Sequence, residues 1–363
     1  MKRALCIPAV LLLMTFPACV PASAAAEEEA LDVKEFIAEH IGDSYEWSVV
    51  SDGDRHIAVP LPVILYSKAT GWHLFSSSRL HHGTASCDGF EIAREGKYKG
   101  RIVETDAEGN LSRPLDLSLT KNAASLLFAS LLTVLTVLGV ARLLKRDPMR
   151  VRKGFAGMIE MLVVSIADGV IKPSIGKDYR RYTPYLLTVF FFIFANNLLG
   201  LIPVFPGGAN VTGNIAVTLV LAVATFLTVN LTGTREYYRE ILWPDVPLWL
   251  KVPFPLMPLV EIVGMFTKPF ALMIRLFANM MAGHSIVLGL TMLIFITAGM
   301  GMAINASMTL VSVIFTVFID LLEFLIAYIQ AYVFTLLSAI YIGLAREEPR
   351  DGRGKVRESG QAA

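Results

Sequence analysis

The sequence predicts an all-α polytopic membrane protein with five membrane-spanning helices, the last two long and tilted, and a small exported α+β N-terminal region. Hydrophobic residues make up 54% of the 363 positions. They gather in long runs almost without charge between residues 122 and 345, whereas residues 27–120 are mixed and polar. A run of about 18 or more apolar residues predicts a span, because about 20 helical residues cross the hydrocarbon.

The N-terminus has the pattern of a secretory signal peptide. Lys2 and Arg3 precede an apolar run to Pro17 and the small residues Ala22-Ser23-Ala24. We therefore expect residues 1–24 to be removed by cleavage after Ala24, and lipoprotein processing at Cys19 is the alternative. With Cys6 and Cys19 in this segment, Cys87 remains alone in the exported region, which excludes a disulfide framework.

Residues 25–120 form the exported, periplasmic region in this prediction. Residues 27–43 have the pattern of a short acidic helix, and β-like segments follow between Tyr45 and Thr105, at residues 47–50, 57–59, 63–66 and 101–103. Pro60 and Pro62 predict that the strand at 63–66 lies at the edge of its sheet.

Several classes of binding site are disfavoured. The five histidines of the exported region accompany no CxxC or HExxH pattern, so we expect no metal site. The chain has no GxxxxGK[ST] loop for a nucleotide, and we expect no cofactor. A net charge of +1 gives no indication of nucleic-acid binding.

Charge in the loops orients the spans, which we place at about 122–141, 184–202, 214–231 and in two long helices over 257–345, broken at 298–301. Lys and Arg follow the first and third spans and the last helix, whereas residues 203–213 contain neither. The positive-inside rule then places the N-terminus in the periplasm and the C-terminus in the cytoplasm of a bacterial inner membrane. Residues 121–345 would be the transmembrane channel domain, and 346–363 a disordered tail.

Buried polar residues carry the chemical argument. At about 100° per residue, Glu261, Lys268, Arg275 and Asn279 fall within about 40° of one another on one helical stripe. His284 lies nine positions beyond Arg275, on another face and about 13 Å further along the helix. A charge inside a span is costly, and it therefore predicts function by default.

The last helix supplies titratable counterparts. Thr316, Glu323 and Gln330 are spaced by seven and share a face, with Asp320 beside Glu323. One helix thus offers a permanent cation and the other offers proton-exchanging groups, a division suited to stepwise proton transfer. Purely structural roles compete for Lys268, which precedes Pro269, and for Asp320. For Asn196 and Asn197, hydrogen bonding between helices is the favoured interpretation.

The segment from Arg275 to His284, RLFANMMAGH, resembles the signature of the F-type ATP synthase subunit a family. Glu261, Lys268-Pro269, the stretch Asn197–Pro203 and the stretch Glu323–Phe334 also match that family, so the resemblance covers about residues 122–345.

The resemblance implies a proton-translocating stator subunit without a catalytic site. Arg275 would face a ring of c subunits, attract their carboxylates and block leakage between two half-channels. His284, Glu323, Gln330 and Asn279 would serve the outer half-channel, and Glu261 the cytoplasmic exit. Asp320 stands beside Glu323 as a further candidate for proton translocation. The implied partners are the c-ring, the subunit b stalk, the other ATP synthase subunits and the lipid bilayer.

The chain also departs from the best-known bacterial pattern. The acid and the imidazole at positions 284 and 323 are exchanged, which favours a His284–Glu323 pair, and Gly200 stands where some members carry an acid. The resemblance explains neither the signal peptide nor the long exported region. A proton-coupled secondary transporter and a membrane-anchored sensor remain alternatives, although neither the inverted repeats of the first nor a cytoplasmic signalling domain is evident.

Overall fold

A computed structural model describes residues 42–346, apart from 53–54, 69, 84, 94–97, 99, 106–110, 147–152, 203–206 and 243–255. The signal peptide, nearly all of the helix predicted at 27–43 and the tail after Arg346 lie outside these residues. The chain divides into two compact units. One contains residues 43–281 and the chain from 324 onward; the other contains residues 282–323.

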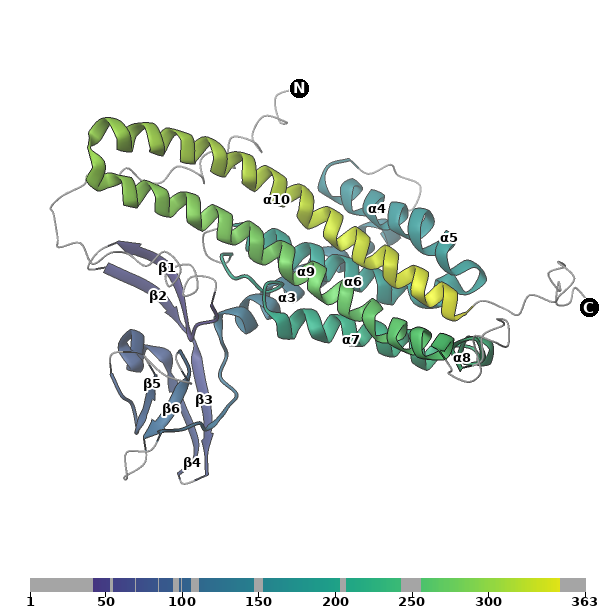
Figure 1. Cartoon of the computed structure of the whole chain (residues 1–363), viewed down its shortest axis with the longest axis horizontal. Helices are drawn as coiled ribbons and strands as arrows, with labels where there is room; N and C mark the ends of the chain where they lie inside the picture. The colour runs from purple at the N-terminus through teal and green to yellow at the C-terminus, as the bar shows by residue number, and fades with distance from the viewer. Residues whose placement is uncertain are drawn as a thin grey trace, which may run out of the picture. The chain divides into compact units, whose positions relative to one another are not determined.

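The first unit begins with a β-rich region, purple and blue in Figure 1. Its strands pair antiparallel in three small sheets, with orders β1-β2, β4-β3-β8 and β5-β6-β7. They are β1 (Glu46–Asp52), β2 (Arg55–Pro60), β3 (Pro62–Ser67), β4 (Gly71–Ser76), β5 (Phe90–Ile92), β6 (Ile102–Thr105), β7 (Leu111–Ser112) and β8 (Leu115–Asp116), with the 3-10 helix η1 (Ser77–Gly83) after β4.

The core of this region lies on one side of β3 and β4. Val63, Leu65 and Phe75 point into it and pack with Leu80 of η1 and Phe90 of β5. Their exposed fractions are between 0% and 6%, so alternate residues of β3 and β4 form a well-buried face.

The β-like segments predicted from the sequence are confirmed as β1, β2, β3 and β6. The predicted edge position of the strand at 63–66 is wrong, because β3 lies between β4 and β8. Pro62 is the first residue of β3, where a missing amide donor is tolerated, and its carbonyl accepts a hydrogen bond from the Leu119 amide.

Hydrogen bonds join the β-rich region to the helices of the same unit. The Lys121 amide donates to the Ser44 carbonyl at 2.8 Å, and the Asn122 amide donates to the Asp43 carboxylate at 3.1 Å. The Trp47 indole donates to the Gly207 carbonyl at 3.1 Å. The β-rich region is therefore hydrogen bonded both to the start of the helix at residues 121–146 and to the loop between the second and third predicted spans.

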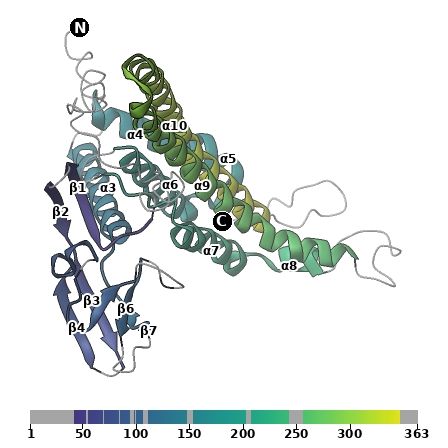
Figure 2. The same ribbon diagram turned by 60° about the vertical axis from the view of Figure 1, so that its left-hand side comes forward.

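Helices, most of them apolar, make up most of the rest of the described chain (Figures 1 and 2). They are α3 (Lys121–Arg146), α4 (Phe155–Ile166), the π-helical segment Ala167–Ile171, α5 (Lys172–Ile175), α6 (Tyr179–Gly200), α7 (Ile215–Thr232), α8 (Arg235–Leu242), α9 (Leu256–Thr297) and α10 (Met302–Ala345). Asn214 caps α7 by accepting a hydrogen bond from the Ala216 amide. Gly301, with φ of 107°, marks the predicted break before α10.

By length and composition, four described helices are able to cross a membrane: α3, α7, α9 with the short 3-10 turn after it, and α10. The 22-residue α6 is not among them, although it covers the second predicted span. A mostly helical, polytopic membrane protein is therefore supported, and the five-span topology stays a prediction.

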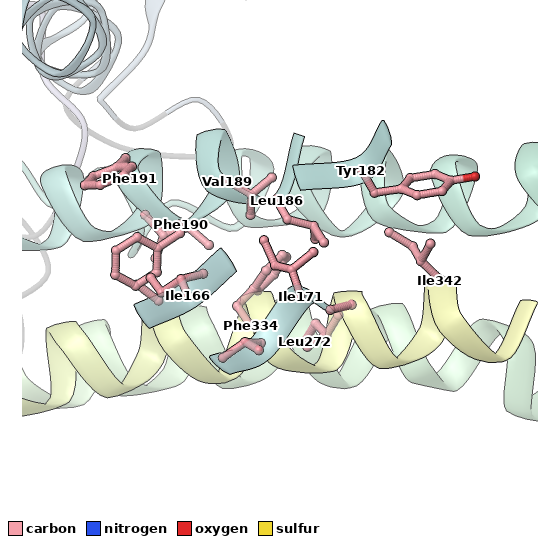
Figure 3. Packing of buried hydrophobic residues seen from close by; sticks show 14 of the residues in the cluster. Ile166, Ile171, Tyr182, Leu186, Val189, Phe190, Phe191, Leu272, Phe334 and Ile342 are labelled. Carbon is pink, nitrogen blue, oxygen red and sulfur yellow. The ribbon is translucent and has the colours of Figure 1, made fainter. Parts of the chain in front are cut away.

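Helix α6 contributes most to the hydrophobic core of the first unit. Figure 3 shows Leu186, Val189 and Phe190 of α6 facing Ile171 of the π segment and Phe334 of α10. Leu272 of α9 joins the same cluster with 2% of its surface exposed. The inner faces of α9 and α10 are thereby fixed against α6, which determines which faces they turn outward.

A pH effect on stability follows from Tyr45. Burial, and then the hydrogen bond from its hydroxyl to Asp116, raise the pKa of Tyr45 from 10.0 to about 12. The folded state therefore holds this proton more tightly than the unfolded state. Its contribution is complete below pH 10 and is lost as pH rises towards 12, by about 2–3 kcal/mol in unfolding free energy.

We expect Tyr45→Phe to abolish that part of the alkaline loss. The measurement is denaturant unfolding of the detergent-solubilised chain between pH 9 and 12, followed by Trp47 emission with the other three tryptophans replaced by Phe. Tyr66→Phe, at an exposed position, is the control and should keep the parent's pH dependence. An unchanged slope in Tyr45→Phe would contradict the assignment.

Candidate functional site

Arg275 lies on the outward surface of α9. It is exposed in this chain, whereas Leu272 and Leu276, on the inner face, have 2% and 0% of their surface exposed. Its neighbours on the outward surface are apolar, since Phe270 is 59% and Ile274 38% exposed. Among the described residues, no acidic side chain forms an ion pair with Arg275. Helix α9 thus presents a permanent cation on a largely apolar surface.

Asn279, one turn further along α9, is hydrogen bonded to α10. Its Nδ2 donates to Oε1 of Gln330 at 2.9 Å. Gln330 is 4% exposed and lies next to Ala331, whose side chain is completely buried. The bond therefore fixes the α9–α10 contact beside Arg275 and places an amide pair there that can bind water or relay a proton.

Glu261 and Lys268 lie nearer the start of α9. Lys268 Nζ is 5.6 Å from the centre of the Tyr341 ring of α10, a cation–π contact. Glu261 acts on Tyr237 of α8: burial first, then the Tyr238 and Glu261 charges, raise the pKa of Tyr237. A small cavity of about 30 Å³ is lined by Lys268, Tyr237 and Tyr341, whereas Glu261 does not line it.

The second unit contains a separate pair. His284 Nδ1 lies 3.8 Å from Oε2 of Glu323, and their side chains are 18% and 11% exposed. Asp320 is close enough for its charge to interact with both groups. The predicted pairing of His284 with Glu323 is thus present, with a second carboxylate beside it, and the three together can accept, hold and release a proton.

Gly283 allows this pair to form. A Cβ at position 283 would meet Glu323 Oε1 at 1.8 Å and its carboxyl carbon at 2.6 Å. The same Oε1 is fully buried and has no hydrogen-bond partner among the described residues. The carboxylate therefore occupies the space that any larger residue would fill.

A polar loop that sequence analysis did not single out lies between α6 and α7. Thr212, completely buried, donates to Asn197 Oδ1 at 2.7 Å, and Asn210 donates to Met281 Sδ at 3.7 Å. The prediction of helix-to-helix bonding is wrong for both asparagines: Asn197 bonds this loop, and Asn196 donates to Phe192 of its own helix. The Asn, Thr and Gly content of residues 207–214 was the available signal.

Metal chemistry finds no support in the described part of the chain. No group of three or more His, Cys, Asp and Glu side chains is arranged there to hold a metal ion. Two pairs of polar side chains join α9 and α10 within otherwise apolar helices, Asn279 with Gln330 and His284 with Glu323.

Comparison with known proteins decides the family. Residues 126–343, which include α9, most of α10 and all seven candidate site residues, match the family described as ATP synthase A chain. The chain belongs to this ATP synthase A chain family. The resemblance drawn from the RLFANMMAGH segment is confirmed.

Three relatives illustrate the extent of the similarity. "ATP synthase subunit a 2" of Chlorobaculum tepidum is 45% identical over 240 residues, 63% of this chain and 64% of that protein. "ATP synthase subunit a" of Chloroherpeton thalassium is 42% identical over 236 residues, 63% of this chain and 67% of the relative. That of Myxococcus xanthus is 42% identical over 261 residues, 69% of this chain and 81% of the relative. The match therefore spans just under two thirds of the Chlorobaculum protein.

The N-terminal part of this A chain matches a second family. Residues 36–123 correspond to a domain of unknown function, DUF8433. These residues contain every strand of the β-rich region and end as α3 begins. The β-rich region therefore corresponds to a family model of its own, which ends before the A chain match begins.

The close approach at Gly283 predicts an unusual effect on stability. Ala normally stabilises a helix relative to Gly by about 1 kcal/mol. Gly264→Ala should follow this rule, because nothing lies within 4 Å of its Cβ. Gly283→Ala should instead lower the melting temperature, because the buried Glu323 carboxylate must move.

Thermal unfolding of the two purified variants in detergent tests this expectation. A Gly283→Ala protein that melts at or above the parent's temperature would show that the Glu323 side chain does not occupy this space.

Proposed function

We propose that this chain is the proton-translocating stator subunit of a rotary F-type ATP synthase in a bacterial inner membrane. Its N-terminal domain would face the periplasm and its C-terminus the cytoplasm, and it would cross the membrane five times. It would carry no catalytic site of its own, since ATP would be made by other subunits. Membership of the A chain family and the four long apolar helices support this proposal.

The observation that carries the proposal is the position of Arg275 on an outward, apolar surface. A guanidinium remains protonated at every physiological pH. Exposed to lipid it would cost several kcal/mol, so it requires an anionic partner. No described acidic side chain of this chain pairs with it, and we infer that the partner is a carboxylate on a c-ring subunit that passes α9.

The proposed cycle then uses the titratable pairs. A proton from the periplasm reaches the His284–Glu323 pair, with Asp320 as a neighbouring acceptor, and is transferred to a ring carboxylate. Neutralised, that carboxylate leaves Arg275 and rotates into lipid, and the next ionised carboxylate takes its place. A ring carboxylate returning on the other side loses its proton towards the cytoplasm, for which Glu261 is the proposed exit residue.

Asn279 and Gln330 have a supporting part in this proposal. Their 2.9 Å hydrogen bond holds α9 against α10 one turn from Arg275. A rigid backbone there keeps the guanidinium at a fixed depth while ring carboxylates arrive and depart. The remaining proposed partners are the subunit b stalk, which prevents this chain from rotating with the ring, and the other ATP synthase subunits.

Replacing Arg275 tests the proposal directly. We expect Arg275→Ala to abolish ATP-driven proton pumping in inverted membrane vesicles that contain the complete ATP synthase, while the subunits still copurify. Arg239→Ala is the matched control, because Arg239 is exposed on α8, next to Glu236, and should leave pumping unchanged. Persistent pumping by assembled Arg275→Ala enzyme would exclude the stator function.

Exchanging His284 and Glu323 tests the pair. Each single change, His284→Glu or Glu323→His, should reduce proton flux, because one partner loses its complement. The double exchange should restore more flux than either single variant, since an acid and an imidazole again meet. Losses that simply add in the double-mutant cycle would argue against a functional contact.

A further inference from the structure

The sheet β4-β3-β8 has a second face that is apolar and bare. In register, Tyr66 of β3 lies opposite Trp72 of β4 and Leu115 of β8, and Ile64 lies opposite Leu74. Trp72 is 65%, Leu74 74%, Leu115 59% and Leu117 55% exposed. We call Tyr66, Trp72, Leu74, Leu115 and Leu117 the apolar face.

The apolar face is not needed to form the domain core. The opposite side of the same strands is filled by Val63, Leu65 and Phe75, so the domain core is already complete without it. A half-buried antiparallel strand normally alternates apolar and polar residues. Here both sides are apolar, and a contiguous exposed patch of large apolar residues marks a contact with a partner or a membrane.

The composition and the rim of the face favour a membrane. Trp and Tyr are enriched at the level of lipid headgroups, because one end of each ring is apolar and the other is polar. The Tyr66 and Trp72 rings pack together with centroids 5.0 Å apart. Lys68, just beyond β3, and Arg113, two residues before Leu115, are exposed basic groups that would meet anionic headgroups.

The connection to α3 places the face within reach of lipid. The Leu117 amide donates to the Ile64 carbonyl, and the Leu119 amide donates to the Pro62 carbonyl, so residues 115–119 continue along β3 towards α3. Helix α3 begins at Lys121, four residues after Leu117. Four extended residues span at most about 13 Å, so Leu117 lies within about 13 Å of the first residue of α3 along the chain.

We propose that the apolar face of the N-terminal domain rests on the bilayer surface, with Trp72 and Leu74 inserted at headgroup level and with Lys68 and Arg113 on anionic lipid. The domain would then be a monotopic membrane contact held beside the spans, in addition to its tether to α3. The proposal rests on the proposed membrane orientation only to assign the contact to the periplasmic leaflet.

Tryptophan quenching tests this contact in the full-length chain. Trp47, Trp243 and Trp249 are changed to Phe, so that Trp72 alone fluoresces in vesicles of phosphatidylethanolamine and phosphatidylglycerol. The matched control also carries Trp72→Phe and Ser86→Trp. Ser86 is exposed between η1 and β5 and is not part of the apolar face.

Brominated lipid should quench Trp72 several-fold more than the tryptophan at position 86, and acrylamide should quench it several-fold less. Equal quenching by acrylamide at both positions would overturn the proposal, since the face would then be in water. Shielding of Trp72 from both quenchers would also overturn it, because a protein surface would then cover the face.

Charge reversal tests the basic rim. Lys68→Glu with Arg113→Glu should reduce brominated-lipid quenching of Trp72 in the anionic vesicles and have little effect in vesicles of phosphatidylcholine. Unchanged quenching in the anionic vesicles would contradict the proposed contact of Lys68 and Arg113 with anionic lipid. Quenching does not depend on proton conduction, so a negative result here leaves the Arg275 test of the stator function unaffected.

Discussion

A permanent positive charge on an apolar helix is the constraint on which the rest of the molecule depends. A guanidinium keeps its charge, and the described part of the chain offers Arg275 no carboxylate as an ion-pair partner; in the proposed function that partner comes from another subunit. Packing of the inner face of α9 determines where the Arg275 side chain lies. Leu272 and Leu276 are almost completely buried, which fixes the rotation of α9 about its axis and leaves the guanidinium on the outward surface.

The titratable groups are placed by a different device. His284 and Glu323 meet because Gly283 has no side chain, so the carboxylate of α10 approaches the backbone of α9. His284 Nδ1 and Glu323 Oε2 are 3.8 Å apart, within the range of an ion pair but longer than a direct hydrogen bond. Arg275 is thus positioned by the packing of α9, whereas the His284–Glu323 pair depends on the absence of a side chain at Gly283.

Sequence patterns predicted the helices well because hydropathy and breaker residues act locally. The spans at 122–141 and 214–231 correspond to α3 and α7, and Gly301 lies at the predicted break. Contacts between elements were harder to predict. Helical spacing assigns Glu323 and His284 to faces of their own helices, but which faces meet depends on tertiary packing, and here the family resemblance supplied the pair. Asn196 and Asn197 show the same limit, as does β4, whose Gly71 and His73 weaken the alternation typical of a strand.

The bond between Trp47 and Gly207 has a consequence for biogenesis. Its two residues are 160 positions apart, and the ribosome completes the whole β-rich domain well before it makes the loop between α6 and α7. During that interval the domain has its own core, but the loop that contains Gly207 has not yet been made. In the proposed five-span topology, the indole would reach this carbonyl only after α6 has entered the bilayer and the loop has emerged on the same side. Docking of the domain would therefore be a late event in assembly, and one that reports correct insertion of the helices that follow it.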